Sequence, residues 1–114
     1  MSNCLFCRIA AGEIPANVIY QNEHVFAFHD IAPQAPVHIV VIPKKHLDNV
    51  QTAQPEDNPI LGALLLAAAH VAELAGVAET GFRVVANAGP DAGQSVDHLH
   101  LHVLGGRKLA WPPG

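Results

Sequence analysis

Three histidines alternate with leucines near the end of the chain: His98, His100 and His102. In an extended strand, side chains two positions apart lie on the same face. The alternation therefore predicts a strand at 98–104, with the imidazoles lining one face and the apolar residues packing on the other. A neutral imidazole is a good nucleophile toward phosphorus when an acceptor holds the proton on its far nitrogen. The middle histidine, His100, has a neighbour on each side and is the predicted nucleophile.

The residues just before the histidines, Gly93-Gln94-Ser95-Val96, predict a loop that could hold an anion. Glycine permits close approach of the backbone to a ligand, and Ser95 offers a hydroxyl donor. Such a short motif is usually only a turn. Because the histidines follow it at once, we interpret it as a phosphate or oxyanion site.

The remaining pattern describes the elements that must position these residues. The chain has 114 residues, which is the size of one domain spanning 1–114. A short helix is predicted at 4–11, strands at 18–20, 24–29, 37–42 and 82–86, and loops at 30–36, 51–58 and 87–95. Strands joined by short turns, with one long helix, predict an α+β fold with an antiparallel sheet.

The long helix is predicted to start at Asn58, a capping residue, with Pro59 in its first position, and to stop at Gly76. Its apolar residues recur at spacings of three and four, which predicts one buried face. That face consists of Leu61, Leu64, Leu65, Ala68, Val71 and Ala75.

Composition narrows the classes of function. The net charge is −4 and Lys plus Arg number six, with no basic cluster, so nucleic acid is not an expected partner. The apolar segment at 60–77 contains His70 and Glu73 and is interpreted as a buried helix, so no membrane partner is expected. With two cysteines and no secretory pattern at the start, the expected location is the cytoplasm.

Several motifs together resemble the Hint branch of the histidine triad (HIT) superfamily over nearly the whole chain. The central one is His98-Leu99-His100-Leu101-His102-Val103-Leu104. The others are Phe28-His29-Asp30-Ile31, Pro36-Val37-His38, Val41-Ile42-Pro43-Lys44-Lys45-His46, Ala92-Gly93-Gln94-Ser95, Gly105-Gly106-Arg107 and Trp111-Pro112-Pro113-Gly114.

The resemblance implies a five-stranded antiparallel sheet with one long and one short helix, and a homodimer whose sheets join into ten strands. It implies a purine nucleoside phosphoramidase that releases an amine from an AMP- or GMP-type substrate through a nucleotidyl-histidine intermediate. Two alternatives stay open. One is a dinucleoside polyphosphate hydrolase or nucleotidyl transferase of the same superfamily, and the other is a zinc-containing nucleotide-binding or interaction module with low activity.

The resemblance also implies roles for individual residues. His100 would carry the nucleotide, while His102, His98 and His38 would orient it and move protons. The phosphate would be held by Ser95 and the backbone of Gly93 and Gln94, with Asn87 beside it. Asp30 would accept hydrogen bonds from the ribose hydroxyls. The base pocket would consist of Phe6, Ile9, Phe28, His29, Ile31 and Val40, and Trp111 would reach the partner's active site. Asp97 departs from the family pattern, which usually has an aromatic residue there.

Cys4 and Cys7 have the two-residue gap of a zinc knuckle. Some bacterial relatives with this pair bind zinc together with the histidine after Pro-Lys and the first histidine of the triad, which here are His46 and His98. Thiolate and imidazole ligands suit zinc. A structural zinc and a pair of reduced, half-buried cysteines both remain open at this point. The proposed reaction itself requires no cofactor.

Overall fold

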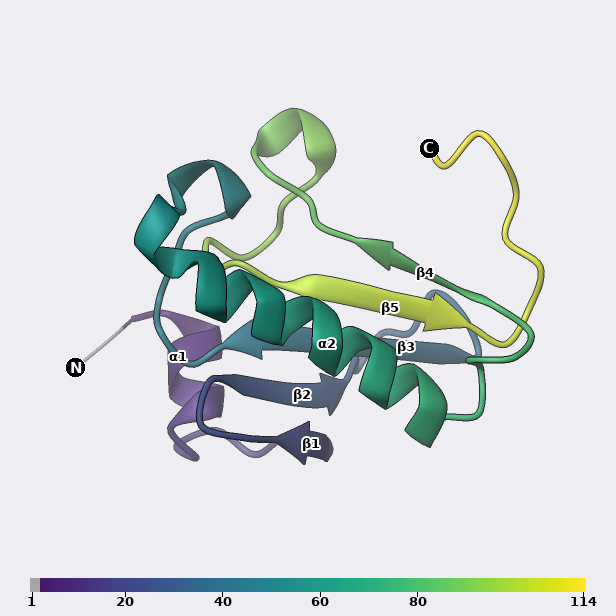
Figure 1. Cartoon of the computed structure of the whole chain (residues 1–114), viewed down its shortest axis with the longest axis horizontal. Coiled ribbons are helices and arrows are strands. Elements are labelled where there is room, and N and C mark those ends of the chain that lie inside the picture. The colour runs from purple at the N-terminus through teal and green to yellow at the C-terminus, as the bar shows by residue number, and fades with distance from the viewer. Residues whose placement is uncertain (1–2) are drawn as a thin grey trace.

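The computed structural model describes residues 3–114, which form one sheet and two α-helices (Figure 1). The helices are α1 (Leu5–Ala10) and α2 (Asn58–Leu74). The strands are β1 (Val18–Gln21), β2 (Val25–His29), β3 (Val37–Pro43), β4 (Phe82–Val85) and β5 (Leu101–Gly105). All neighbouring strands are antiparallel, in the order β1-β2-β3-β5-β4. The predicted α+β fold with a five-stranded sheet is confirmed.

The turn between β1 and β2 lies where the polar residues predicted it. The side-chain oxygen of Asn22 accepts hydrogen bonds from the backbone amides of His24 (2.9 Å) and Val25 (3.0 Å). An asparagine in this role replaces backbone hydrogen bonds that a tight turn cannot make. The hairpin brings β2 beside β3, which lies at the centre of the sheet.

Helix α2 covers one face of the sheet (Figure 1). It begins one residue earlier than predicted. Asp57, and not Asn58, is the N-cap residue, and Asn58 is the first residue of the helix. Its buried residues are Leu64, Ala67, Ala68, Val71 and Ala72. The prediction that Leu65 is buried was wrong, because it lies at the margin of this stripe and 60% of it is exposed beside an apolar groove.

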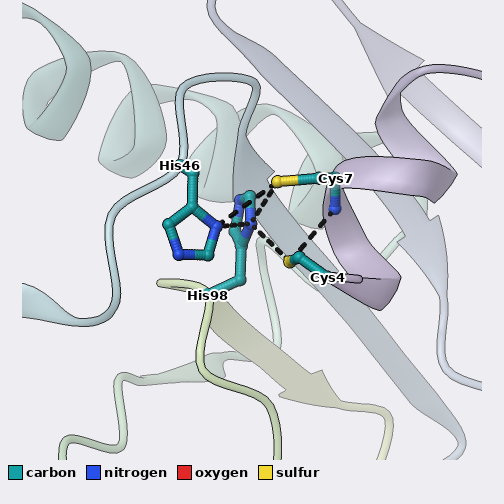
Figure 2. A group of neighbouring side chains, drawn as sticks. All are labelled: Cys4, Cys7, His46 and His98. Carbon is teal, nitrogen blue, oxygen red and sulfur yellow. Dashed lines mark hydrogen bonds between the residues drawn. The ribbon is translucent and has the colours of Figure 1, made fainter. Parts of the chain in front are cut away.

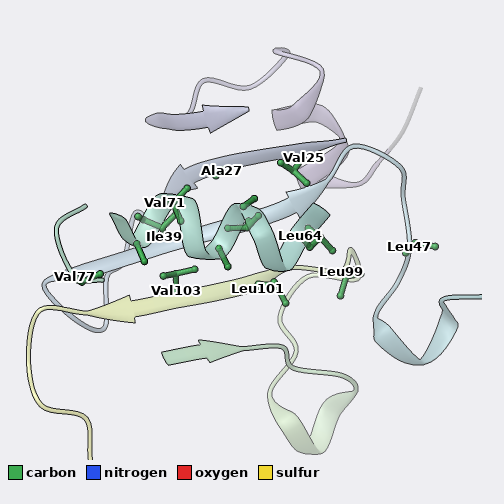
Figure 3. Close-up of a cluster of buried hydrophobic side chains, with 14 residues drawn as sticks. Val25, Ala27, Ile39, Leu47, Leu64, Val71, Val77, Leu99, Leu101 and Val103 are labelled. Atoms are coloured by element: carbon green, nitrogen blue, oxygen red, sulfur yellow. The ribbon is translucent and has the colours of Figure 1, made fainter. Parts of the chain in front are cut away.

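Two apolar clusters lie on opposite faces of the sheet. The larger one fills the space between the sheet and α2 and includes Val25, Ile39, Leu64 and Val71 (Figure 3). The smaller one joins Phe6 and Ile9 of α1 to residues of β2 and β3, namely Phe26, Phe28, Val40 and Ile42. The central strand β3 is therefore buried on both faces, which explains its unbroken apolar sequence.

The prediction that the strand starts at His98 was wrong, because β5 begins only at Leu101. Strand β3 ends at Pro43. The Pro43 carbonyl accepts a hydrogen bond from the side chain of His98, whose Nε2 lies 2.8 Å away. The amide of Leu99 instead donates to the carbonyl of Leu47, at 2.6 Å. The predicted alternation of apolar and histidine side chains still holds, since Leu99, Leu101 and Val103 are all buried in the cluster under α2.

The predicted loops contain short turns of helix. Residues 51–58 overlap the 3₁₀ helices η1 (Val50–Thr52) and η2 (Pro55–Asp57), and the loop after β4 contains η3 (Pro90–Ala92). The buried carboxylate of Asp57 bonds the backbone amide of Gln54 and the ammonium of Lys45, at 2.9 and 2.7 Å. The bond between Lys45 and Asp57 ties the segment after β3 to the start of α2. Within the described residues, no helix has the length and apolar character needed to cross a bilayer.

Candidate functional site

The position of the proton on the His100 ring is set by the backbone of His98, two residues earlier in the chain. Nδ1 of His100 lies 2.7 Å from the carbonyl oxygen of His98. A carbonyl oxygen can only accept, so Nδ1 carries the proton and Nε2 keeps its lone pair. Only 3% of His100 is exposed, and its ring packs edge-on against Phe6 (5.1 Å between centroids) and His102 (5.0 Å). The middle histidine therefore has the tautomer that a nucleophile at Nε2 requires.

A chain of hydrogen bonds also sets the tautomer of His102. The backbone amide of Gln34 donates to Nδ1 of His38 at 3.0 Å, so the proton of neutral His38 is on Nε2. That nitrogen lies 2.8 Å from Nδ1 of His102, which must accept. His102 is thus left with Nε2–H as a donor. Burial lowers the pKa of His102 to about 4, with a smaller contribution from the neighbouring His100 and His38.

Asp30, His38 and His102 come close enough to suggest a second metal site. The tautomers argue against one. Nε2 of His38 carries the proton that it shares with His102, and it also lies 3.4 Å from the Asp30 carboxylate. A protonated nitrogen has no lone pair to give a metal. The three residues are better described as a hydrogen-bonded chain that fixes His102.

A cavity of about 380 Å³ opens beside Phe6, on the face of the sheet opposite α2. It brings together all the residues predicted for the base and ribose, with Ser95 at the same cavity. Its lining includes Phe6, Ile9, Phe28, His29, Asp30, Ile31, Val40, Ser95 and Val96. The Asp30 carboxylate is fixed there by a bond from the amide of Ala32, 2.8 Å from its Oδ1.

A smaller cavity of about 190 Å³ is lined by His38, His102 and Asn87, together with Gln34, Val85 and Leu104. His100 contacts one residue from each cavity, Phe6 on one side and His102 on the other. The nucleophile candidate therefore contacts the lining of both cavities. This is the arrangement expected if a ligand placed its base in one cavity and its reacting group next to the other.

The predicted phosphate loop contains the turn η3, which ends at Gly93 with a left-handed φ of 79°. Glycine adopts that conformation without steric cost. Ser95 is exposed at the rim of the larger cavity. The side chain of Gln94 points into the protein instead, where it bonds the residues 48–49 and the ends of its own loop. Of this loop, only its backbone and Ser95 are placed for an anion.

The four predicted metal ligands converge, although they come from three distant parts of the chain (Figure 2). Nδ1 of His98 lies 3.2 Å from Sγ of Cys4, 3.4 Å from Sγ of Cys7 and 3.1 Å from Nδ1 of His46. Sγ of Cys7 is 3.3 Å from Nδ1 of His46. Tetrahedral zinc with sulfur at about 2.3 Å and nitrogen at about 2.0 Å gives separations of about 3.3 Å between two nitrogens and about 3.5 Å between a nitrogen and a sulfur. The observed separations are close to these.

The outer nitrogens of both histidines support this interpretation. Nε2 of His98 lies 2.8 Å from the Pro43 carbonyl, and Nε2 of His46 lies 2.8 Å from the Asp48 carboxylate. Each therefore donates outward, which leaves two Nδ1 lone pairs facing each other. A bound cation removes that repulsion, and a histidine that binds a metal usually donates its other N–H in this way. Burial also lowers the pKa of His98, which favours the neutral ligand form.

The ring of His98 is thus directed toward the cysteines. Of the two roles expected of His98, orienting His100 and moving protons, the contacts support the first. Its Nδ1 faces the metal ligands and its Nε2 is committed to Pro43, so only its backbone carbonyl acts on His100. Trp111, which was expected to reach the partner's site, is 81% exposed in the C-terminal tail. Asp97, the departure from the family pattern, is also exposed.

Sequence reasoning missed the groups that orient the histidines. The amide of Gln34 and the carbonyls of Pro43 and His98 are backbone groups, which carry no signal in a sequence. Asp48 is different, because a carboxylate two residues after a candidate ligand such as His46 is a recognisable pattern for a supporting acceptor.

Comparisons with known proteins show the family and the fold. A family model described as the HIT domain matches residues 11–109. An uncharacterized HIT-like protein of Synechococcus elongatus is 51% identical over 110 residues, which are 96% of each chain. A HIT family hydrolase from Legionella pneumophila superposes with a TM-score of 0.96 at 47% identity, covering 98% of this chain and all of that one.

A histidine triad nucleotide-binding protein from Candida albicans is more distant, with a TM-score of 0.82 and 30% identity over 96% of this chain and 83% of that one. The family model spans all five strands of the sheet and the three histidines. On this similarity of sequence and structure, the chain belongs to the HIT domain family and resembles its hydrolases.

Proposed function

We propose that this protein is a purine nucleoside phosphoramidase, which cleaves the P–N bond at the α-phosphorus of an AMP- or GMP-type substrate. The observation that carries the proposal is the tautomer of His100. Its Nδ1 proton is held by the His98 carbonyl at 2.7 Å, so Nε2 keeps a lone pair in a ring that contacts the lining of both cavities. The description of the Candida albicans relative as nucleotide-binding supports a nucleotide substrate.

The reaction would have two displacements at phosphorus. In the first, Nε2 of His100 bonds to the α-phosphorus as the P–N bond to the amine breaks. The amine leaves with the bonding pair and takes a proton from solvent. In the second, water attacks the phosphohistidine, the bond to His100 breaks, and the nucleoside monophosphate is released. Two in-line displacements restore the free imidazole.

Negative charge on the phosphate oxygens would be stabilised by donors fixed before the substrate arrives. His102, neutral at pH 7 because its pKa is about 4, offers Nε2–H from a ring already aligned by His38. The hydroxyl of Ser95 and the loop backbone near Gly93 would hold another oxygen. Fixed donors in a partly buried site stabilise a transition state without the cost of reorganising water.

The larger cavity supports the placement of the nucleoside. Phe6, Phe28 and Val40 offer apolar surface for a purine, and the fixed carboxylate of Asp30 is an acceptor for the vicinal ribose hydroxyls. Ile31 is fully exposed at the mouth, where it could cover the open face of the base.

We also propose that the protein is a homodimer. Strand β4 is at the edge of the sheet and pairs with β5 alone. Next to it lies an apolar groove of about 430 Å³ lined by Val50, Leu61, Leu64, Leu65, Val84, Ala86, Leu99 and Leu101. Pairing two β4 edges would extend the sheet to ten strands, cover Leu65 and Val84, and protect an open edge. The exposed tail with Trp111 could then approach the partner's site.

A structural zinc on Cys4, Cys7, His46 and His98 completes the proposal. The spacing of the four donor atoms and the outward hydrogen bonds of both histidines support it. Such a metal supplies cross-linking of the chain and takes no part in the chemistry at phosphorus. By holding His98 in place, the ligand set would also hold the carbonyl that orients His100.

The decisive experiment compares initial rates on an adenosine phosphoramidate and on a diadenosine polyphosphate, with intact-protein mass spectrometry of quenched reactions. We expect faster turnover of the phosphoramidate and a transient mass increase of one nucleotidyl group on His100. Preference for the polyphosphate would favour a polyphosphate hydrolase of the same family. Nucleotide binding without cleavage of either compound would favour a binding module and contradict the proposal.

A further inference from the structure

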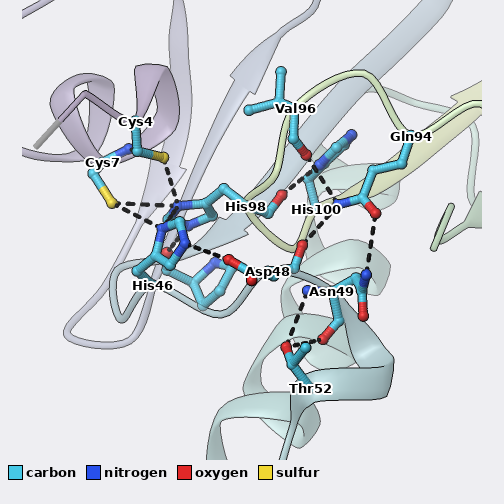
Figure 4. Close-up of polar contacts among 11 residues, drawn as sticks. Cys4, Cys7, His46, Asp48, Asn49, Thr52, Gln94, Val96, His98 and His100 are labelled. Atoms are coloured by element: carbon cyan, nitrogen blue, oxygen red, sulfur yellow. Dashed lines mark hydrogen bonds and ion pairs between the residues drawn. The ribbon is translucent and has the colours of Figure 1, made fainter. Parts of the chain in front are cut away.

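Gln94 lies in the loop at residues 89–96, and its side-chain amide makes four hydrogen bonds within the protein. Figure 4 shows its bonds with Asp48, Asn49 and Val96. Its oxygen accepts from the backbone amide of Gly89 (2.9 Å) and from the side chain of Asn49 (3.2 Å). Its nitrogen donates to the carbonyls of Asp48 (2.7 Å) and Val96 (3.0 Å). A primary amide has two donors and two main acceptor sites, so none remains for a ligand.

Two of these bonds close the phosphate loop on itself. Gly89 and Val96 stand at the two ends of the loop, and both are bonded to the same amide group. The backbone adds a bond from the Gln94 amide to the Gly89 carbonyl, at 3.2 Å. Ser95 lies within the closed segment and is itself exposed. The position of its backbone is therefore set largely by where Gln94 is anchored.

The other two bonds anchor that loop to the segment that carries a predicted metal ligand. Asp48 gives its backbone carbonyl to Gln94 and its carboxylate to Nε2 of His46, 2.8 Å away. Asn49 caps the 3₁₀ helix η1, since its side-chain oxygen accepts from the amide of Gln51 at 2.9 Å. One glutamine thus joins the loop beside the nucleophile to the rigid start of η1 (Figure 4).

We propose that Gln94 is a positioning residue that fixes the phosphate loop, and with it Ser95, at the distance from His100 that the reaction needs. The inference rests on the proposed function. It assigns the recognition of the phosphate to the loop and leaves the nucleoside to the separate cavity at Phe6 and Asp30. A change at Gln94 should therefore weaken binding of the phosphate group and leave binding of the nucleoside intact.

Gln94→Met tests this, because methionine has a similar length and no hydrogen-bonding amide, and it adds no charge. We expect the affinity for AMP, measured by calorimetry, to fall about tenfold, as for loss of a hydrogen bond to a charged group. The affinity for adenosine should stay within about twofold of wild type. Turnover of an adenosine phosphoramidate should fall about 10²-fold, mainly in kcat, because a displaced loop misaligns the transition state.

Gln51→Met is the matched control, since Gln51 is exposed on the neighbouring η1 and its side chain makes no hydrogen bond to another residue of 3–114. It should behave as wild type. If Gln94→Met does not fold, Asn49→Ser provides a milder test. Serine can still cap η1, but the donor to Gln94 is lost, so AMP binding should weaken by a smaller factor while adenosine binding is kept.

Two results would overturn the inference. One is an unchanged ratio of AMP to adenosine affinity in both variants, and the other is an equal loss of both affinities, which would indicate only general destabilisation. Failure of the proposed function looks different. In that case the wild-type protein would neither bind AMP more tightly than adenosine nor cleave the phosphoramidate, before any variant is compared.

Discussion

Nδ1 of His100 donates to the backbone carbonyl of His98 across 2.7 Å, and the ring of His98 is itself held between Pro43 and the two cysteines. A single residue therefore belongs to both proposed sites, with its side chain among the proposed metal ligands and its carbonyl bonded to the proposed nucleophile. A change in the proposed metal ligands should therefore move His100 through this one hydrogen bond. Metal binding would then affect the reaction without any metal at the reacting atoms.

His100→Ala should lower turnover of an adenosine phosphoramidate by at least about 10⁴-fold, because the attacking lone pair is removed. Binding of AMP should change only a few-fold, since the phosphate donors and the nucleoside cavity remain. Steady-state kinetics and calorimetry on the same preparation check both. His24→Ala, which changes an exposed histidine outside the site, is the control, and turnover retained in His100→Ala would refute the assignment.

Two substitutions of His38 should show whether its hydrogen bonds or its size matter for activity. In His38→Gln, the amide can accept from the Gln34 backbone and donate to Nδ1 of His102, so activity should fall less than about tenfold. In His38→Leu, His102 loses its partner and can adopt the other tautomer, and kcat should fall about 10²-fold. Rates of the two variants at pH 7 are compared. Equal losses would show that the bond at 2.8 Å does not set the His102 tautomer.

The metal cluster predicts one zinc ion per chain in protein purified without chelator, measured by elemental analysis. Cys7→Ser should lose the metal and lower the melting temperature, because a ligand set that holds three distant segments together is broken. Activity should fall in part, through the movement of His98. A variant with a changed exposed histidine, His70→Gln, should keep both the zinc and the stability. Wild-type protein without zinc under these conditions would contradict the metal proposal.

Stability should depend on pH through His102. Its pKa is about 4 when folded, against 6.5 as the ordinary value, so between these the unfolded chain binds a proton that the folded chain does not. The free energy of unfolding should therefore fall as the pH drops from 6.5 toward 4, and this contribution is fully present above pH 6.5. Urea unfolding at several pH values, with metal removed, measures the slope.

His102→Gln is the matched variant, since glutamine can accept from His38 and does not titrate in this range. Its unfolding free energy should depend less steeply on pH than that of the wild type. His98, whose pKa is also lowered by burial, contributes equally to both proteins and cancels in the comparison. Parallel slopes would mean that His102 titrates alike in the folded and unfolded chains.

The sequence by itself determined the elements and the types of residue in the site. Period-two alternation placed Leu99, Leu101 and Val103 in the core and left the histidines on the other face, because a buried aliphatic position tolerates no imidazole without a partner. The spacing of three and four placed most of the buried face of α2, and the apolar run at 37–42 marked the central strand. These are local patterns of hydrophobicity, which each segment carries on its own.

Only the tertiary structure decided what each histidine does. That His98 turns its ring to Cys4 and Cys7 depends on where β3 ends and where α1 packs, and that Gln94 faces inward depends on the neighbouring residues 48–49. The tautomers of His38 and His100 follow from backbone groups of Gln34 and His98. Every residue has such groups, so their positions follow from packing across the whole chain, and no local pattern records them.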